Sequence, residues 1–307
     1  MQSILITGSN GFIGSHLSKY FSEKNYRIYG VSKYPLEKLN LCSFKENIIC
    51  DLLGEEVKDL LKKIQPDYIF HCAGNSSIKN SIKNPLNDFQ NNSYLTYEFL
   101  NLIRQFTPSS KFYFFSSAAV YGNPQTLPIK ENHNLNPISP YGFHKLLSEH
   151  MCIEFSKLYS LNTVILRIFS AYGAGLRRQI FYDLMNKFVN DKEIILKGTG
   201  KESRDFINVF DICKAIELIM AAKSNEFEVY NIANGEEITI KNIASLFSSY
   251  LDSNKAIKFD NKNTFGMPLN WKADITKLKK IGFKKNIQFH LGIKDYISWF
   301  NNDILME

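Results

Sequence analysis

Three glycines near the start of the chain constrain its fold more than any other feature. Gly8, Gly11 and Gly14 follow the apolar residues 4–6 and precede a segment, 12–21, whose apolar residues recur at helical spacing. Gly8 allows a tight turn, Gly11 a close approach of the backbone to a pyrophosphate, and Gly14 close packing of a helix on a strand. This order of strand, turn and helix predicts the first unit of a dinucleotide-binding α/β fold, with phosphates at the helix N-terminus.

Strand and helix patterns alternate over the first half of the chain. Strands are expected at 26–31, 48–50, 68–72, 111–115 and 163–169, and helices at 55–64, 85–106 and 141–159. This alternation predicts an α/β protein, a doubly wound parallel Rossmann sheet with a smaller C-terminal substrate-binding lobe. We expect the dinucleotide-binding domain at 1–169, with 205–234 returning to it, and the substrate-binding lobe at 170–204 and 235–307.

Composition limits the class of protein. The 307 residues are 44% hydrophobic and 14% aromatic, enough for a full core, and their net charge of +7 is spread over many lysines. No apolar run approaches the ~20 residues of a membrane span. The residues before the first strand are too few for a secretory signal. Five scattered cysteines form no C-x-x-C pair, which favours reduced thiols: Cys42, Cys50, Cys72, Cys152 and Cys213. We expect a cytoplasmic protein with no membrane and no nucleic-acid partner.

The expected cofactor site extends from the glycine turn to the ends of the next strands. Ser32 and Lys33 stand where an NAD site places an acidic residue, so NADP(H) is favoured; NAD(H) remains open, because Lys33 is equally understood as a surface lysine. Asp51 and Leu52 are placed to bracket an adenine, and Ala73 permits close approach of the cofactor. The turn residues Asn10, Phe12 and Ile13 complete the set.

Chemistry is expected from three residues in the middle of the chain. Tyr141 and Lys145 lie four apart at the start of a helix, so they share one face. A lysine ammonium beside a phenol favours phenolate and prepares Tyr141 as a general acid or base. Ser117 ends a parallel strand, where ligands of such sheets bind. His71 and His144 have no second ligand at metal spacing, so they are expected to pack or hydrogen-bond, and no metal is predicted.

These features together resemble the extended short-chain dehydrogenase/reductase family, the nucleotide-sugar epimerases, dehydratases and reductases. The residues that carry the resemblance are Thr7-Gly8-x-x-Gly11-x-x-Gly14, Asp51-Leu52, Ala73-Gly74, Asn92, Ser116-Ser117-x-x-Val120-Tyr121-Gly122, Tyr141-x-x-x-Lys145, Leu166-Arg167-x-Phe169 and Gly198-Thr199-Gly200-x-x-x-Arg204-Asp205-Phe206.

The resemblance implies roles for several residues. Ser117, Tyr141 and Lys145 would be the catalytic triad, with Lys145 also on the nicotinamide ribose and Asn92 near the cofactor. Arg204 would hold the diphosphate of a nucleoside-diphosphate sugar, with Arg177 and Arg178 adding to it. The resemblance also implies a homodimer, formed through helices near 91–106 and 142–159.

Departures from the family pattern narrow the reaction. Ala118 and Ala119 stand where sugar-nucleotide 4,6-dehydratases carry an Asp-Glu pair, which argues against dehydration. Ser170 replaces an Asn common in 4-epimerases, and no Arg precedes Ala273-Asp274. The sequence therefore favours NADP(H)-dependent reduction of a 4-keto, 6-deoxy nucleoside-diphosphate sugar. An NAD-dependent UDP-hexose 4-epimerase is the alternative, and a non-catalytic dinucleotide-binding protein is a remote third reading.

Overall fold

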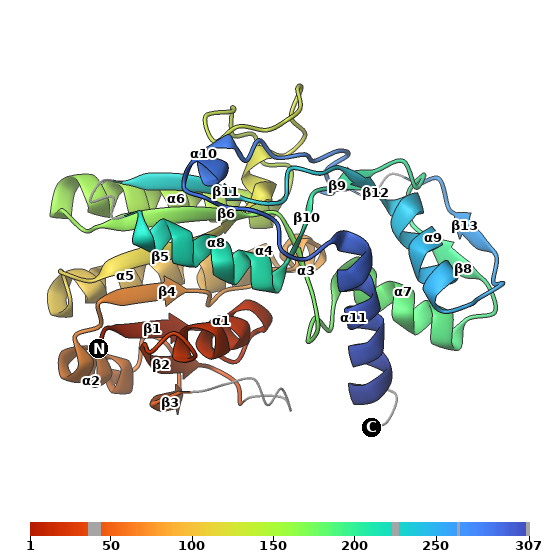
Figure 1. Cartoon of the computed structure of the whole chain (residues 1–307). Helices are drawn as coiled ribbons and strands as arrows, with labels where there is room; N and C mark the ends of the chain where they lie inside the picture. Colours follow the sequence, from red (N-terminus) through yellow and green to blue (C-terminus); the bar gives the residue numbers. More distant parts are fainter. Residues whose placement is uncertain (36–43, 223–226, 263–264, 305–307) are drawn as a thin grey trace. The chain divides into compact units, whose positions relative to one another are not determined.

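A seven-stranded sheet is the largest sheet in the described part of the chain. The computed structural model describes residues 1–35, 44–222, 227–262 and 265–304. The sheet order is β11-β6-β5-β4-β1-β2-β3, and the pairings from β1 to β6 are all parallel (Figure 1). Its strands are β1 Ser3–Thr7, β2 Arg27–Ser32, β3 Glu46–Ile49, β4 Tyr68–His71, β5 Lys111–Ser117, β6 Thr163–Ile168 and β11 Glu228–Ile232. The predicted doubly wound sheet is confirmed, with a reversal of strand order between β1 and β4, where such folds bind ligands.

The long helices follow the sequence expectations closely, and two short helices are additions. The elements are α1 Phe12–Ser22, α2 Glu55–Ile64, α3 Ile78–Lys83, α4 Pro85–Phe89, the π-helix η1 Gln90–Tyr94, α5 Leu95–Phe106, the 3₁₀-helix η2 Ala118–Tyr121 and α6 Pro140–Tyr159. The expected helix from 85 to 106 forms, but a π turn interrupts it. The segment 75–84, expected as polar chain, contains α3, which begins because the Ser77 side chain accepts a hydrogen bond from the Asn80 N–H.

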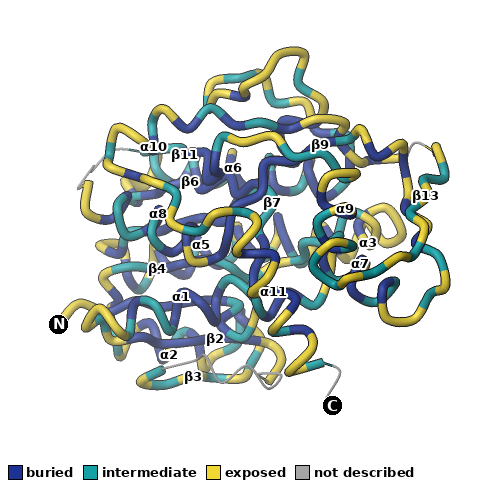
Figure 2. Tube along the Cα trace, turned by 45° about the vertical axis from the view of Figure 1, so that its right-hand side comes forward, coloured by how far each residue is buried: buried dark blue, intermediate teal, exposed yellow. Residues whose placement is uncertain are grey.

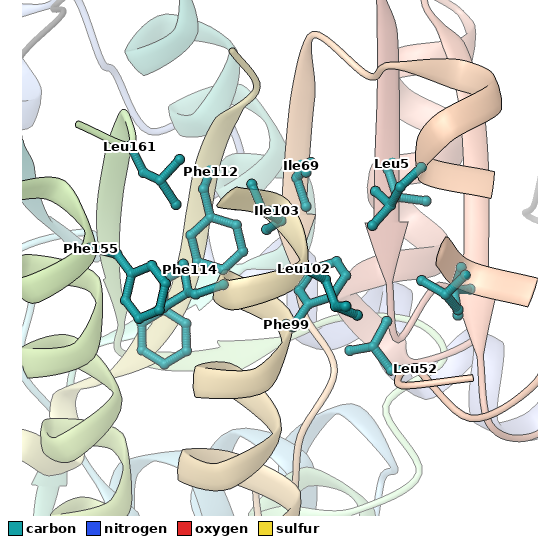
Figure 3. Packing of buried hydrophobic residues seen from close by; sticks show 14 of the residues in the cluster. Leu5, Leu52, Ile69, Phe99, Leu102, Ile103, Phe112, Phe114, Phe155 and Leu161 are labelled. Carbon is teal, nitrogen blue, oxygen red and sulfur yellow. The ribbon is translucent and has the colours of Figure 1, made fainter. Parts of the chain in front are cut away.

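The core lies on the buried strands. Phe112 and Phe114 of β5 pack with Phe99 and Ile103 of α5 and with Phe155 of α6 (Figure 3). Figure 2 shows the central strands as buried along most of their length. A strand that is buried on both faces carries a continuous apolar run. The sequence of β5 therefore predicts a buried strand although its apolar and polar residues do not alternate. Each such phenylalanine stabilises the fold by about 1.5–3 kcal/mol relative to an exposed position.

The chain divides into two compact units, which are described separately. Unit 1 comprises Met1–Gly122, Asn134–Ile168 and Ile219–Tyr230, and unit 2 comprises Asn123–His133, Phe169–Leu218 and Asn231–Glu307. The remaining elements are β7 Ser170–Tyr172, α7 Gln179–Asn190, β8 Ile194–Leu196, β9 Ser203–Arg204, β10 Phe206–Asn208, α8 Val209–Ala221, β12 Ile238–Thr239, α9 Ile240–Tyr250, β13 Ile257–Phe259, α10 Thr276–Lys280 and α11 Phe289–Asp303. Aromatic packing supplies the core of unit 2, around Tyr172, Phe181, Phe206, Phe289 and Tyr296.

None of the helices in the described ranges is long and apolar enough to cross a membrane. No disulfide joins the four described cysteines, and the fifth, Cys42, lies outside the described residues.

Candidate active site

The glycine turn joins β1 to α1 with little space to spare. Gly8 has a φ of +65°, and its N–H donates to the Val31 carbonyl at 2.8 Å. A Cβ on Gly14 would lie 2.4 Å from the Gly8 carbonyl oxygen, so only glycine allows α1 to approach the turn this closely. No side chain caps α1, which begins at Phe12 and leaves its first N–H groups without an intrahelical acceptor. Phe12 and Ile13 are half-buried and Gly11 is exposed. The arrangement fits a phosphate group at this helix end.

Asn10 is committed to holding the turn in place. Its Nδ2 donates to the Tyr34 carbonyl at 2.8 Å, and its Oδ1 accepts from Asn47 Nδ2 at 3.0 Å. The Asn47 Oδ1 also accepts from the Ser9 hydroxyl at 2.9 Å. The predicted cofactor residue Asn10 therefore connects the glycine turn to β3 and to the residues after β2.

The ends of β2 and β3 carry the residues from which cofactor preference was predicted. Ser32 and Leu52 are buried, whereas Lys33 and Asp51 are exposed. Lys33 Nζ lies 3.9 Å from Asp51 Oδ2. A carboxylate this close offsets the lysine charge and would repel a 2′-phosphate. The argument from Lys33 toward NADP(H) is weaker in the structure than in the sequence, because the sequence did not place Asp51 beside it.

An unsatisfied amide lies at the end of β4. Asn92, in η1, is 1% exposed, and neither its Oδ1 nor its Nδ2 has a hydrogen-bond partner. A Cβ on Gly74 would lie 2.7 Å from Asn92 Oδ1, so the amide lies against the chain after β4. The neighbouring Ala73 N–H donates to Thr7 Oγ1 at 3.3 Å. A buried amide without partners costs free energy, which a ligand with hydrogen-bonding groups would recover. Asn92, like the helix end, fits a dinucleotide.

The three predicted catalytic residues lie in unit 1. Ser117 is the last residue of β5, and its Oγ accepts from the Ala119 N–H at 3.1 Å, which starts η2. Tyr141 and Lys145 occupy the first two turns of α6 and are 8% and 6% exposed. The α6 N-terminus is capped by Ser139, whose Oγ accepts from the Gly142 N–H at 3.2 Å. The parallel pairing of β1, β4 and β5 places Gly8, Ala73 and Ser117 at one edge of the sheet.

Lys145 is an ammonium group in an apolar setting. Its Nζ donates to the Phe115 carbonyl at 2.9 Å and lies 4.8 Å from the centroid of the Phe114 ring. Burial lowers the pKa of Lys145 to about 8, although nearby Asp88 opposes the shift. A lysine so poised can stabilise a neighbouring phenolate while staying largely protonated at neutral pH.

Both histidines considered in the sequence make side-chain hydrogen bonds, as expected. His71 Nδ1 lies 2.8 Å from Thr7 Oγ1, and His71 Nε2 lies 3.3 Å from Thr96 Oγ1. Burial, with a smaller effect of Lys145, lowers the pKa of His71 to about 3, so this imidazole is neutral. His144 contacts Asp88. Within the described residues, no group of three or more His, Cys, Asp or Glu side chains could hold a metal ion.

A buried ionic network beside the site was missed by the sequence reasoning. Glu149 accepts from Arg167 Nη2 at 2.7 Å and from the Ser116 hydroxyl at 2.5 Å, while Arg167 Nη1 donates to Tyr121 Oη at 2.8 Å. Ser116 precedes Ser117, and Glu149 lies one turn beyond Lys145, so the network joins the end of β5 to α6. The spacing of Lys145 and Glu149 would have indicated an ion pair within α6, whereas Glu149 binds Arg167 and Ser116.

The three predicted substrate arginines belong to unit 2. Arg177 is half-buried and Arg178 is exposed, immediately before α7. Arg204 is 9% exposed, and its Nη1 donates to the carbonyls of Ser203 at 2.7 Å and Leu269 at 3.0 Å. Its guanidinium lies 5.4 Å from the Trp271 ring centroid, and burial lowers its pKa to about 10. Among the described residues Arg204 has no ion pair with a carboxylate, so a bound anion could supply one.

The residue after Arg204 fixes the surrounding backbone. The buried Asp205 carboxylate accepts from the N–H groups of Asn234, Gly235 and Ala273 at 2.9, 2.9 and 3.0 Å. Burial raises the pKa of Asp205 to about 7 despite these donors. The neighbouring residues Arg204 and Asp205 thus differ in role: Arg204 is a candidate for binding an anion, and Asp205 accepts hydrogen bonds that hold the backbone.

Comparison with known proteins places the chain in a family. Residues 4–233 match the model of the NAD dependent epimerase/dehydratase family. An uncharacterized UDP-glucose epimerase of Bacillus subtilis is 30% identical over 91% of this chain and 91% of its own.

Two solved structures match along nearly their whole length. The UDP-N-acetylglucosamine 4-epimerase of Methanobrevibacter ruminantium M1, in complex with UDP-N-acetylmuramic acid, is 29% identical with a TM-score of 0.87, over 97% of this chain and 98% of that one. The UDP-glucuronic acid 4-epimerase of Bacillus cereus, in complex with UDP-glucuronic acid and NAD, is 26% identical with a TM-score of 0.88, over 98% and 99%. The chain belongs to the NAD dependent epimerase/dehydratase family and is an enzyme of the short-chain dehydrogenase/reductase type.

Proposed function

We propose that this protein is an NAD-dependent 4-epimerase of a UDP-sugar. The observation that carries the proposal is its similarity, over nearly the full chain, to two solved 4-epimerases, one of which binds UDP-glucuronic acid and NAD. The alanines at 118 and 119, where dehydratases carry acids, support epimerisation over dehydration.

This proposal replaces the reductase favoured by the sequence. That preference depended on Ser32 and Lys33 as partners of a 2′-phosphate. Because Asp51 lies 3.9 Å from Lys33, the positive charge at this strand end is partly offset. The comparisons favour the epimerase alternative and give no support to NADP-dependent 4-keto reduction.

The residues of unit 1 have distinct tasks in this reaction. A bound nicotinamide dinucleotide supplies the acceptor and donor of hydride. Tyr141 takes the proton of the sugar 4-hydroxyl and returns it after the sugar presents its other face. Ser117 hydrogen-bonds the same oxygen, and the ammonium of Lys145 keeps the Tyr141 phenol acidic. The buried amide of Asn92 and the N-terminus of α1 hold the cofactor.

Arg204 is proposed to bind the substrate diphosphate. Its guanidinium is already desolvated and oriented by two carbonyl oxygens and the Trp271 ring, so little ordering remains to be done on binding. Arg177 and Arg178 are proposed to add positive charge. The absence of a second arginine before Ala273-Asp274 leaves this chain with fewer phosphate ligands than the family pattern, which favours Arg204 as the principal one.

A homodimer through η1, α5 and α6 is also proposed. These helices expose large apolar side chains in unit 1, the kind of surface that a second copy would cover. The exposed apolar side chains of these three helices are Tyr94, Tyr97, Phe143, Leu147, Leu158 and Tyr159.

The test is to incubate the purified protein with UDP-glucose, UDP-N-acetylglucosamine or UDP-glucuronic acid and follow the sugar by NMR. An epimerase converts at least one substrate to its 4-epimer with catalytic NAD⁺ or with cofactor that co-purifies. The Tyr141→Phe variant should lose about 10²–10⁴-fold in rate with an unchanged fold. Turnover that needs stoichiometric NADPH and a 4-keto sugar would instead establish the reductase.

A further inference from the structure

A fully buried carboxylate lies beside the catalytic helix and has no part in the proposed reaction so far. Asp88, in α4, is 0% exposed. Its Oδ2 contacts His144 Nδ1 at 2.6 Å, and its Oδ1 accepts from Asn75 Nδ2 at 2.9 Å. Asn75 is itself oriented, because its Oδ1 accepts from the Ser77 N–H at 3.3 Å. Both carboxylate oxygens of Asp88 are thus held by hydrogen-bond donors, as a buried charge requires.

Residues 75–93, which include Asp88, make two further hydrogen bonds to the first turns of α6. The Tyr141 N–H donates to Ser81 Oγ at 3.1 Å, and the Ser93 hydroxyl donates to the His144 carbonyl at 2.9 Å. His144 immediately precedes Lys145 and lies three residues after Tyr141. Residues 75–93 therefore bring Asp88 to the turn of α6 that carries Tyr141 and Lys145.

The other ionisable groups around Lys145 are poor counter-charges. His71 on β4 is neutral. Burial raises the pKa of the Cys152 thiol on α6, which keeps that thiol uncharged, and Cys72 follows β4 with only a smaller effect on Lys145 than Asp88. Glu149 on α6 is already bound to Arg167, with 2.7 Å between Glu149 Oε2 and Arg167 Nη2. Asp88 is the remaining carboxylate among the described groups that act on Lys145.

We propose that Asp88, held by His144 and Asn75, is a positioning residue that keeps the side chain of Lys145 in its ammonium form. Lys145 carries its charge in the protein without substrate, so the effect of Asp88 on Lys145 does not depend on the proposed reaction. The consequence for catalysis rests on the proposed function, since an uncharged Lys145 would no longer favour the phenolate of Tyr141.

The test is to measure the titration of Lys145 in the cofactor-free protein by NMR of ¹³Cε-labelled lysine, with the resonance assigned by Lys145→Met. In Asp88→Asn, which is isosteric, the titration midpoint of Lys145 should fall by about one pH unit or more. Asp59→Asn, which removes an exposed carboxylate from α2, is the matched control and should leave the midpoint unchanged. Equal midpoints in the two variants would overturn the proposal.

A second variant covers the case in which Asp88→Asn does not fold. Asp88→Ser also removes the carboxylate, and the titration midpoint of Lys145 should fall by a similar amount. An unchanged midpoint in folded Asp88→Ser would refute the assignment.

Activity gives a separate readout. In Asp88→Asn the alkaline limb of the kcat profile should move to lower pH, whereas His144→Gln, which keeps an N–H donor toward Asp88, should leave that limb near its original place. If no UDP-sugar is epimerised by the unmodified protein, the proposed function fails while the NMR titration still decides the role of Asp88.

Discussion

Arg167 and Glu149 form a buried, bidentate ion pair. Arg167 Nη2 lies 2.7 Å from Glu149 Oε2 and Arg167 Nε lies 3.0 Å from Glu149 Oε1, and both residues are less than 5% exposed. The pair joins β6 to α6. Removing one partner strands the other charge in the core, so Glu149→Gln should destabilise the protein by about 3–5 kcal/mol. Urea unfolding at pH 7 measures this, with the exposed Glu56→Gln as control; a loss below about 1 kcal/mol would contradict the estimate.

The glycine turn predicts a selective defect in cofactor binding. In Gly14→Ala the new Cβ would lie 2.4 Å from the Gly8 carbonyl oxygen, so α1 must move away from the turn. The expected cost is about 1–3 kcal/mol of stability, with weaker NAD⁺ binding. Calorimetric titration with NAD⁺ checks it. Gly54→Ala, where the new atom would meet mainly the flexible Glu56 side chain, should bind NAD⁺ normally.

Arg204 predicts a binding defect without a folding defect. Arg204→Met keeps the length of the side chain over Trp271 but removes the charge that we assign to the diphosphate. Affinity for UDP should fall about tenfold to a hundredfold, the value of a charge-assisted hydrogen bond. Titration with UDP measures this. Lys277→Met, which removes a lysine charge from α10, should bind UDP as the unmodified chain does, and equal affinities for the two variants would remove Arg204 from the site.

His71 predicts part of the acid sensitivity of the fold. Its pKa is about 3 in the folded protein against an ordinary value of 6.5, so the unfolded chain binds the proton first as the pH falls. His71 therefore destabilises the folded state progressively from about pH 6.5 down to about pH 3. In His71→Asn that contribution is absent, so the decline in unfolding free energy between pH 7 and pH 4.5 should be shallower than in the unmodified protein. The unfolding free energy is measured by urea titration at both pH values. An equal decline in the variant and the unmodified protein would show that His71 is already charged in the folded state.

The sequence predicted those parts of the structure that depend on neighbours along the chain. Gly8 to Gly14 form one local motif, and β5 is a continuous apolar run, so both were readable. The positions of Ser117 at a strand end and of Tyr141 and Lys145 at a helix start were readable in the same way, whereas their catalytic roles stay a prediction. In contrast, β9 and β12 have two residues each, too few for any periodicity to be recognised.

Contacts between distant residues could not be predicted in this way. Asp88 and His144 are 56 positions apart, and nothing in either segment indicates the other. The same limitation affected the cofactor argument. Lys33 was considered alone, although the parallel pairing of β2 with β3 places Asp51 beside it. A side chain's charge can be read from the sequence, but the charge that opposes it depends on strand pairing.

The π turn at Gln90–Tyr94 fixes the number of residues between α4 and α5, and a change in that number would destabilise the fold. One additional residue in a helical turn rotates everything before it by about 100° relative to everything after it. Deleting a single residue from 90–94 would give a more regular helix, but it would turn α4 away from α6 or α5 out of the core. The number of residues between Asp88 and Phe99 therefore sets the rotation of α4 relative to α5. Substitutions in this segment should be tolerated better than insertions or deletions.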